Sequence, residues 1–533
     1  MNFDEIRRAI AEGNTSLGIE LGSTRIKSVL VGPDCQPLAT GEFQWENQRR
    51  DGLWTYDLVD TVRGVQESYA SLAARVREKY GEPLRRVGAL GISGMMHGYL
   101  AFDKDGNQLS FFHTWRNTHA QEAADRLTEL FQFNIPIRWS IAQMYQEVLN
   151  GSEHVARLDF LTTLAGYIHW QLSGEKVLGV GEASGMFPID SAARDYDGEM
   201  LSRFDREVAP KGYSWKLRDL LPRVLCAGDR GGVLTPAGAK LLDPTGTLEP
   251  GVPMAPPEGD AGTVMVATNA VRPGTGNVSA GTSIFAMIVL EKNLSRLYPE
   301  IDMVTTPAGD PVAMVHCNTC TSDLDDWVRL LGEMAAAAGA TLSRNELYTL
   351  FYRKALEGDP DCGGLVNFNC FSGEPVTGLP DGRPLLVRRP DARFTLANFA
   401  RVQLYACLAT LKYGLDILFE EEQVTADHLL GHGGLFKVPV VGQKLLAGAL
   451  GVPVSVMQTA GEGGPWGMAL LAGYRLHRAE GETLEQYLHR RIFAGAVGST
   501  VQPDARDSRG FAAFMKQYIR CLAVERAAID ALP

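Results

Sequence analysis

The stretch SLGIELGSTRIKSVLVG, residues 16–32, gives the first clear structural signal in this chain. Two runs of apolar and β-branched residues flank a short turn that contains glycine, which is the pattern of a β-hairpin. A second stretch, GTGNVSAGTSIFAMIVL at residues 274–290, repeats the order of strand, glycine turn and strand. The repetition indicates two α/β domains that open with the same hairpin.

The segments after the two hairpins continue in a similar way. In the first half we expect a third strand at 35–45, a helix at 58–80, a buried strand at 86–94 and a helix at 120–130. In the second half we expect strands at 311–318, 426–434 and 453–458, and helices from 322, at 396–419, at 439–450 and from 466. Stretches rich in proline and glycine at 243–259 and 373–393 are expected to be loops. These patterns predict an N-terminal domain of residues 1–265, a C-terminal domain of residues 266–533 and a ligand cleft between them.

Composition narrows the class of protein. The chain has 533 residues, 45% of them hydrophobic and 21% charged, as in ordinary globular proteins. The net charge of −12 and the lack of a basic stripe argue against nucleic-acid binding. The first residues, MNFDEIRRAIAEG, lack the apolar core of a signal peptide, and we expect no membrane span. Eight cysteines are too few for a disulfide scaffold in so long a chain, which favours a reduced, cytoplasmic setting.

The two hairpin turns carry groups suited to phosphate. In the first, the backbone N–H groups of Gly22, Ser23 and Thr24 can face an anion, Lys27 adds a cation, and the Glu20 carboxylate can hold a hydrated Mg²⁺. In the second, Gly281 allows close backbone approach, and Thr282 and Ser283 supply hydroxyls. Either turn alone also fits an ordinary hairpin with a solvated rim. As a pair, they are able to hold the β- and γ-phosphates of a nucleotide from opposite sides.

Two further glycine clusters follow strands and open helices. The stretches are GHGGLFK, residues 431–437, and AGEGGPWG, residues 460–467. Such glycines let a flat ligand approach the backbone, and a helix N-terminus offers free N–H groups. The nucleotide-binding candidates here are Gly433, Gly434, Lys437, Gly463 and Gly464. The alternative is a pair of tight turns with packing glycines. Neither stretch is a GxGxxG fingerprint, and the chain has no GxxxxGK[ST] motif.

With these motifs in this order, the chain resembles the FGGY family of carbohydrate kinases, within the actin, Hsp70 and hexokinase superfamily. ELGSTRIK is similar to the first phosphate motif of the family, SAGTS to the second, and the two glycine clusters to its adenosine motif. GISGMMHG at 91–98 and TWRNTHAQ at 114–121 resemble the sugar-binding segments of xylulokinases. The resemblance covers nearly the whole chain. It implies two RNase H-like domains of the actin and hexokinase type, with ATP as phosphoryl donor and Mg²⁺ as the metal.

The resemblance also implies roles for single residues. Asp260, in PPEGDAGTV at 256–264, takes the position of the catalytic base of the family. Phosphoryl transfer needs an aligned alcohol and an acceptor for its proton, which a carboxylate at the floor of a cleft provides. The alternative is that Asp260 only caps a helix from Ala261. The implied sugar-binding residues are Met96, His97, Trp115 and Asn117, together with Asp260. A buried core histidine and a packing tryptophan remain the alternatives for His97 and Trp115.

Two departures from the family pattern bear on the substrate. The first phosphate motif has Glu20 where the family has Asp, and Ala261 stands where xylulokinases have Asn. The resemblance favours a ketopentose such as xylulose, phosphorylated on its terminal primary hydroxyl. Ribulose, a deoxy-ketose, an erythritol-like polyol, or a nucleotide-binding sensor without transfer activity remain alternatives. A homodimer is compatible with the sequence, which does not fix the oligomeric state.

Overall fold

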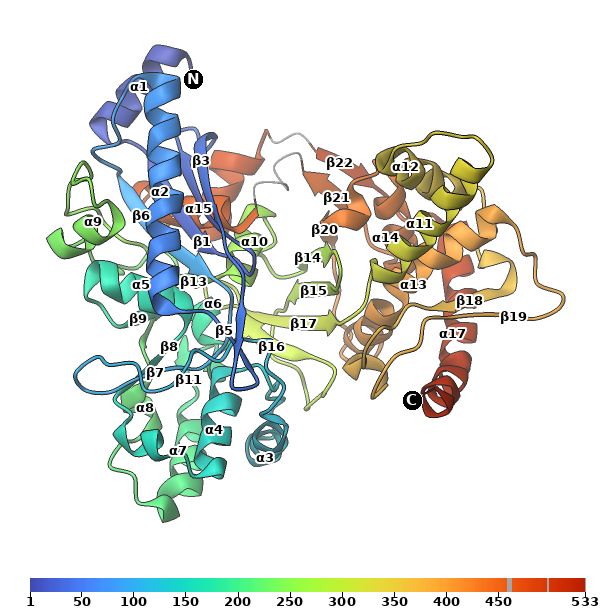
Figure 1. The fold of residues 1–533 in the computed structure, drawn as a ribbon, viewed down its shortest axis with the longest axis horizontal. Helices are drawn as coiled ribbons and strands as arrows, with labels where there is room; N and C mark the ends of the chain where they lie inside the picture. The colour runs from blue at the N-terminus through green and yellow to red at the C-terminus, as the bar shows by residue number, and fades with distance from the viewer. Residues whose placement is uncertain (458–462, 496–497, 533) are drawn as a thin grey trace.

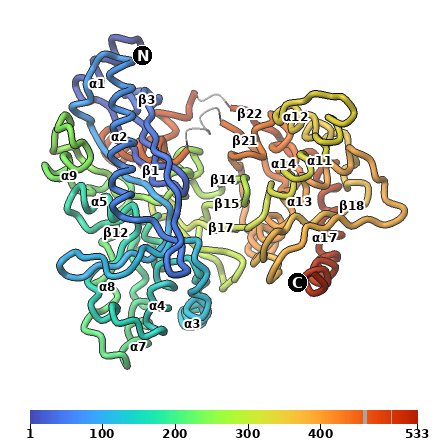
Figure 2. The backbone as a smooth tube through the Cα atoms, in the orientation of Figure 1, coloured from blue at the N-terminus to red at the C-terminus, as the bar shows by residue number. Residues whose placement is uncertain are grey.

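A computed structural model describes residues 1–457, 463–495 and 498–532 of the chain. Two α/β units lie side by side, the N-terminal one drawn mostly from blue to green and the C-terminal one mostly from yellow to red (Figure 1). The two ends of the chain lie far apart, one on each unit (Figure 2). The fold is therefore the two-domain α/β arrangement that the repeated hairpin predicts.

The N-terminal sheet has five strands in the order β13–β6–β1–β2–β3. Strands β1 (Ser16–Leu21), β2 (Arg25–Val31) and β3 (Pro37–Gln44) are antiparallel neighbours, as predicted for the first hairpin and the strand after it. Strand β6 (Ala89–Gly94) is parallel to β1, and β13 (Glu258–Gly259) is parallel to β6. The carboxyl ends of β1, β6 and β13 therefore meet at one edge of the sheet, where open α/β sheets bind ligands.

The C-terminal sheet repeats this pattern and extends it. Its order is β16–β17–β15–β14–β20–β21–β22. The strands are β14 (Thr275–Ala280), β15 (Ile284–Val289), β16 (Asp302–Thr305), β17 (Pro311–Cys317), β20 (His428–His432), β21 (Val454–Met457) and β22 (Gly498–Val501). The three strands β14, β15 and β17 are antiparallel, and β20 and β21 follow in parallel, which matches β1, β2, β3, β6 and β13 in turn. The edge strands β16 and β22 are additions that the sequence patterns did not predict.

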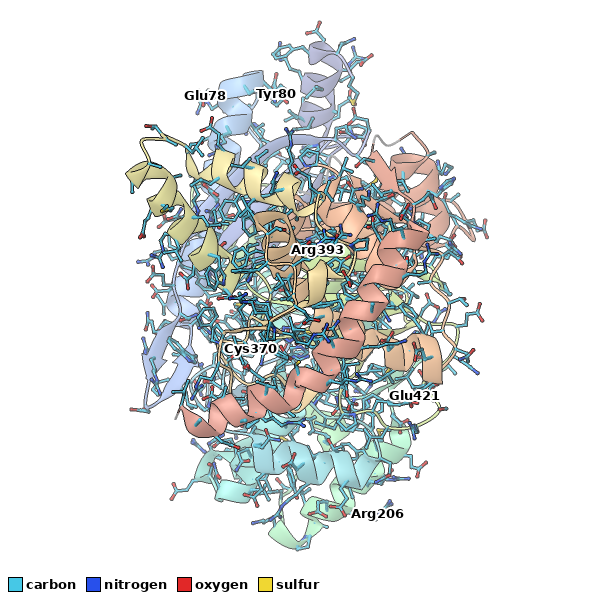
Figure 3. The ribbon with its side chains drawn as sticks, turned by 90° about the vertical axis from the view of Figure 1, so that its right-hand side faces the viewer. Glu78, Tyr80, Arg206, Cys370, Arg393 and Glu421 are labelled. Carbon is cyan, nitrogen blue, oxygen red and sulfur yellow. The ribbon has the colours of Figure 1, made fainter. Side chains whose placement is uncertain are left out.

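Helices cover both sheets at close range. Helix α2 (Leu58–Tyr80) has the predicted bounds and lies on β3, where a Cβ on Gly41 would overlap the Ser68 carbonyl. In the C-terminal unit, α13 (Leu396–Asp416) is buried along almost its whole length. The long helix α17 (Ala505–Ala531) crosses the outer face of that unit (Figure 3). Helix α14 (Val441–Leu450) also forms where the periodicity predicts it.

Two helices connect the units. Helix α10 (Asp260–Ala267) leads out of the N-terminal sheet, and α15 (Gly463–His477) packs back onto it. A Cβ on Gly18 of β1 would overlap the Pro465 carbonyl, and a Cβ on Gly467 would overlap the backbone of Thr263 in α10. The chain thus returns to the N-terminal core after residue 463. The predicted division at residue 265 falls within α10 and remains a prediction.

A second contact joins the units at β16. Arg138 forms an ion pair with Asp302, and Asn134 Nδ2 donates to Asp302 Oδ1 at 2.9 Å. Thr305 Oγ1 donates to the Val180 carbonyl at 3.1 Å. One hydrophobic cluster includes residues of both units, so the units share a core on this side.

The predicted loops contain short elements. Strand β13 lies in the stretch 243–259, and β19 (Leu385–Arg388), paired with β18 (Leu365–Phe368), lies in 373–393. Two- to four-residue strands carry too few alternations to show a period, so the expectation of plain loops was wrong there. The segment Leu396–Glu421 is long and apolar enough to cross a membrane, but 72% of its most apolar window is buried inside the protein. It serves as a core helix.

The remaining helices are α1 (Phe3–Glu12), α3 (Gln121–Phe131), α4 (Ser140–Asn150), α5 (Leu164–Ser173), α6 (Val180–Ala183), α7 (Gly198–Val208), α8 (Leu217–Leu220), α9 (Pro236–Leu242), α11 (Ser322–Ala337), α12 (Arg344–Ala355) and α16 (Leu484–Leu488). The remaining strands are β4 (Gln48–Arg50), β5 (Leu53–Thr55), β7 (Leu100–Phe102), β8 (Phe160–Thr162), β9 (Val177–Gly179), β10 (Ile189–Asp190), β11 (Asp195–Tyr196) and β12 (Arg223–Leu225).

Candidate functional site

Three strand ends in the N-terminal sheet bring three carboxylates to one edge. Glu20 of β1 pairs in register with Ser93 of β6, and Ser93 pairs with Glu258 of β13. Asp260 follows β13 directly as the first residue of α10. The sheet register therefore gathers residues from three distant segments at the edge where ligands are expected.

Asp260 has the surroundings of a proton acceptor. Its Oδ1 accepts from the Ala261 N–H at 2.9 Å and from the Met96 N–H at 3.4 Å. Burial raises its pKa to about 6, and the backbone N–H groups act in the opposite direction. The helix N-cap is Gly259 rather than Asp260, although the contact with Ala261 also satisfies one N–H of the first turn. A carboxylate with this pKa is ionised at neutral pH and still basic enough to take a proton.

Glu20 is a buried carboxylate with a free oxygen. Its Oε2 has no hydrogen-bond partner, and burial together with the charge of Asp260 raises its pKa to about 8, while Lys27 acts to lower it. The carboxylate lies against the start of α15, where a Cβ on Gly464 would overlap Oε2. An unpartnered buried oxygen next to a turn suits a cation or its bound water.

Two neighbouring carboxylates were missed by the sequence analysis. Glu258 accepts from the N–H groups of Gly181 and Glu182 at 3.2 and 2.9 Å, and burial raises its pKa to about 8. Glu182 is completely buried with both oxygens unpartnered, and burial and the nearby carboxylates hold its pKa well above the usual range. The sequence did signal Glu258, because the pattern Glu-Gly-Asp brings a second carboxylate to the strand end. Glu182 had no signal beyond its place in a glycine-containing turn.

Met96 contacts Asp260 through its N–H, and His97 is the next residue in the chain. His97 has a left-handed backbone, with φ of 70°, and its Nδ1 lies 3.0 Å from the Gly185 carbonyl. A carbonyl only accepts, so Nδ1 carries the proton and Nε2 offers a lone pair. Burial lowers the pKa of His97 to about 3, so the ring is neutral. A Cβ on Gly259 would overlap Met96, which explains the glycine before Asp260.

Trp115 and Asn117 differ in solvent exposure and in hydrogen bonding. Trp115 is exposed. Asn117 is buried, and its amide accepts from the Trp54 N–H at 2.7 Å and donates to the Trp54 and Thr114 carbonyls. These bonds tie residues 114–117 to strand β5. The sugar-contact role of Asn117 stays a prediction, and its observed contacts are all with backbone.

The first phosphate turn is held by aromatic side chains. Between the paired residues Leu21 and Ile26, Gly22 donates to the Arg25 carbonyl at 2.9 Å. Trp45 donates to the Gly22 carbonyl at 2.8 Å and Tyr56 to the Ser23 carbonyl at 2.6 Å. Thr24 is exposed and Lys27 half-buried. These two side-chain hydrogen bonds to the Gly22 and Ser23 carbonyls fix the backbone of the turn.

The second turn lies together with Gly433 and Gly434 in the C-terminal unit. Gly281 donates to the Ser283 carbonyl at 2.9 Å, and Thr282 is exposed. A Cβ on Gly433 would overlap the Ala280 carbonyl at the end of β14, so that glycine packs directly against the turn. Gly434 follows it, and Lys437 lies exposed one turn later. Gly463 and Gly464 open α15 on the other unit, and residues 460–462 of that motif lie outside the described residues.

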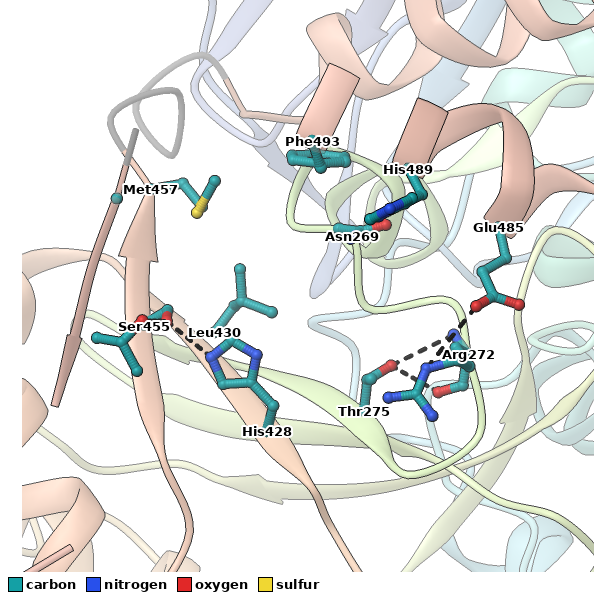
Figure 4. Close-up of a pocket in the computed structure, with 12 residues that line it drawn as sticks. Asn269, Arg272, Thr275, His428, Leu430, Ser455, Met457, Glu485, His489 and Phe493 are labelled. Carbon is teal, nitrogen blue, oxygen red and sulfur yellow. Dashed lines mark hydrogen bonds and ion pairs between the residues drawn. The ribbon is translucent and has the colours of Figure 1, made fainter. Parts of the chain in front are cut away.

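A polar cavity of about 380 Å³ lies near the junction of the units (Figure 4). One wall is the C-terminal sheet, where His428 Nε2 and Ser455 Oγ are 2.7 Å apart. The other wall includes Glu485, which lies 3.8 Å from Arg272 Nε, and His489. None of the predicted site residues lines this cavity. It is therefore separate from the edge that carries Asp260.

Comparison with known proteins covers both units. Residues 15–262 match the model of the N-terminal domain of the FGGY family of carbohydrate kinases, and residues 276–476 match that of the C-terminal domain. The chain is 23% identical over 407 residues to a xylulose kinase from Haemophilus influenzae, covering 71% of this chain and 76% of that protein.

Two solved structures from Lactobacillus acidophilus are similar in fold. A ligand-bound xylulose kinase gives a TM-score of 0.76 at 16% identity, covering 97% of this chain and 98% of that one. A gluconate kinase gives a TM-score of 0.78 at 16% identity, covering 97% and 99%. Proteins named for different sugars are equally similar, so the shared fold does not decide the sugar.

Proposed function

Because the chain belongs to the FGGY family of carbohydrate kinases, and so is an ATP-dependent sugar kinase, we propose that its substrate is a ketopentose, with xylulose favoured. The phosphoryl group would pass to the terminal primary hydroxyl of the sugar. The H. influenzae xylulose kinase, which matches most of the chain, supports this choice.

The observation that carries the proposal is the position of Asp260. It lies at the carboxyl end of β13, where it accepts from the Met96 N–H, and burial raises its pKa to about 6. In the proposed reaction, Asp260 accepts the hydroxyl proton as the sugar oxygen bonds to the γ-phosphorus and the bond to the β-phosphate oxygen breaks. The turns at 22–24 and 281–283 would hold the phosphates by their N–H groups.

His97 favours a neutral sugar. With Nδ1–H donated to Gly185, the free Nε2 can accept a hydrogen bond from a sugar hydroxyl. The ring carries no charge at neutral pH, and the nearby cation Arg138 is paired with Asp302. A carboxylate-bearing sugar such as gluconate would need a free cation here, which makes it the less favoured substrate.

The residues at the first turn fit Mg²⁺. Glu20, with its buried unpartnered Oε2, would hold the ion through water, and bound Mg²⁺ offsets the negative charge of the phosphates. Glu20 is one methylene longer than the aspartate of the family, so its carboxylate reaches further toward Gly464. Lys27, opposite Glu20 in the hairpin, adds positive charge on the same turn.

A second candidate follows from Ala261. Its methyl group makes no hydrogen bond where xylulokinases have an amide, so ribulose, a deoxy-ketose or a polyol is the next candidate substrate. We propose a cytoplasmic location, since the eight cysteines are all free thiols. A homodimer stays a prediction.

The test is ATP consumption by the purified protein with a panel of ketoses, polyols and aldonates. We expect D- or L-xylulose to give the highest kcat/KM, with phosphate on the terminal carbon of the product. Asp260→Asn, assayed on the same panel, controls for contaminating kinases. A higher kcat/KM for gluconate or a polyol would overturn the ketopentose assignment, and no stimulation by any compound would favour the sensor alternative.

A further inference from the structure

A cluster of histidines lies in the N-terminal unit behind the sugar-binding segments. His113 and His119 flank the segment that carries Trp115 and Asn117, and Glu147 faces them from α4. One ligand atom from each of the three lies within 4.8 Å of the others. Among residues 1–457, 463–495 and 498–532, this is the one group of three or more such side chains close enough to share an ion.

The ring nitrogens in this cluster lack partners. His113 is 4% exposed, and its Nδ1 is buried without a hydrogen bond. Both ring nitrogens of His119 are also buried without one. Each unsatisfied buried polar atom costs about 1–3 kcal/mol. Each imidazole can bind an ion through one nitrogen, so one free nitrogen from each ring, next to one carboxylate, indicates a shared bound partner.

The polar side chains around the cluster form hydrogen bonds elsewhere and not with the unpartnered ring nitrogens of His113 and His119. Tyr99 hydroxyl pairs with His154 Nε2 at 2.8 Å, which occupies that histidine. Ser152 donates to Glu147 Oε2 at 2.6 Å, so the second carboxylate oxygen, Oε1, remains for a ligand. The rings of His113 and His119 are nearly perpendicular, at 81°, with centroids 5.1 Å apart.

The chemistry of the three groups selects a metal. Burial lowers the pKa of His113 to about 3 and also lowers that of His119, so both imidazoles are neutral, the form that binds metal. Two imidazoles and one carboxylate are ligands of zinc. Zinc bonds of about 2.0–2.2 Å place tetrahedral ligand atoms roughly 3.4 Å apart. Small side-chain rotations would bring the three atoms from within 4.8 Å to that spacing.

We propose that His113, His119 and Glu147 bind one zinc ion, which fastens residues 113–119 to helix α4. The ion would leave a fourth position for water. It would hold in place the segment of Trp115 and Asn117 and thereby the wall of the sugar pocket. This effect on the sugar rests on the proposed function; zinc binding itself does not.

The first experiment is equilibrium dialysis of the full-length protein against Zn²⁺ at pH 7.5, without ATP or sugar, with metal measured by mass spectrometry. We expect one equivalent per chain. His119→Gln and Glu147→Gln should each weaken binding at least tenfold, while His489→Gln, outside the cluster, should not. Circular dichroism and Tm show that each variant is folded. Co²⁺ in place of Zn²⁺ should give the visible absorption of a tetrahedral site.

Two results would overturn the site. One is the absence of bound Zn²⁺ at about 100 μM free metal, which would leave the cluster to water. The other is binding that persists unchanged in both His119→Gln and Glu147→Gln, which would place the ion elsewhere. For the consequence, chelation of the wild-type zinc should raise KM for the sugar more than KM for ATP. If zinc binds but its removal raises both KM values equally or neither, the metal site is supported and its proposed effect on sugar binding is wrong.

Discussion

The two hairpin turns hold matching places in their sheets but differ in length and in chemistry. Two residues before the turn glycine, the first hairpin has Glu20 and the second has Ser279. Opposite these positions in register lie Lys27 and Phe285. The first turn is four residues long between its paired strands and the second is three, residues 22–25 and 281–283.

The two hairpins therefore share their place in the sheet but not the charge of their side chains. Carboxylates gather on the N-terminal side, where Asp260 acts on Glu20, and Glu258 and Asp260 act on Glu182. The second turn offers N–H groups and hydroxyls. Acceptor activation and a metal need negative charge, whereas phosphate oxygens need neutral or positive donors. The predictions below test this division.

The largest effect is expected for Asp260. Asp260→Asn removes the proposed proton acceptor while keeping the size of the side chain and an oxygen that can accept from Met96 and Ala261. Loss of a general base costs about 10²–10⁴-fold in kcat, with ATP affinity little changed. Steady-state kinetics and nucleotide titration check this. A variant with near wild-type kcat would show that Asp260 does not accept the hydroxyl proton.

A smaller effect is expected for His97. His97→Ala removes the Nε2 atom proposed to accept from a sugar hydroxyl, and an unpaired polar partner costs about 1–3 kcal/mol. We expect kcat/KM for the sugar to fall roughly ten- to a hundred-fold, with KM for ATP unchanged. The measurement is paired kinetics with sugar and ATP varied in turn. A loss confined to ATP would mean that the sugar pocket lies elsewhere.

Gly464, which lies against Glu20 of the first hairpin, and Gly281, in the second turn, give a matched pair of glycine-to-alanine variants. In Gly464→Ala, the new Cβ would overlap Glu20 Oε2, and such overpacking typically costs about 1–3 kcal/mol. In Gly281→Ala, the new Cβ meets nothing within 4 Å. We expect a lower Tm and a higher Mg²⁺ requirement for Gly464→Ala only. Gly281→Ala should keep the wild-type Tm and raise KM for ATP, because phosphate approaches that backbone.

If Gly281→Ala changes neither Tm nor KM for ATP, the second turn does not contact phosphate. An unchanged Mg²⁺ requirement in Gly464→Ala would separate Glu20 from the metal.

The smallest effect concerns stability and pH. The pKa of Glu182 is raised in the folded protein, so the folded state binds more protons than the unfolded state above pH of about 4.5. Stability then falls as pH rises from that value toward the folded pKa, by at most about 1.4 kcal/mol per pH unit. Glu182→Gln should reduce the slope of the free energy of unfolding against pH, measured by urea unfolding between pH 5 and 7. Glu129→Gln, on the exposed side of α3, is the control. Equal slopes in all three proteins would show that Glu182 is ionised in the native state.

The sequence predicted the local elements well for physical reasons. Hairpins 16–32 and 274–290 and helix α2 depend on alternation, turn glycines and helical periodicity, which are properties of neighbouring residues. It also located the Asp260 segment through the order of the motifs. Several of the shortest strands, such as β13 and β19, were missed because so few residues show no period.

The sequence by itself determined two similar α/β units, their turns and the residue types available for phosphate and sugar. Only the tertiary structure decided which of these residues meet. It placed Gly464 against Glu20, Glu182 beside Asp260, and Glu147 beside His113 and His119. Those contacts join segments that are far apart in the chain, so they depend on sheet register and on the packing of α15 onto β1. The raised pKa values arise from the same packing, because burial acts on a carboxylate only once distant elements have excluded water from it.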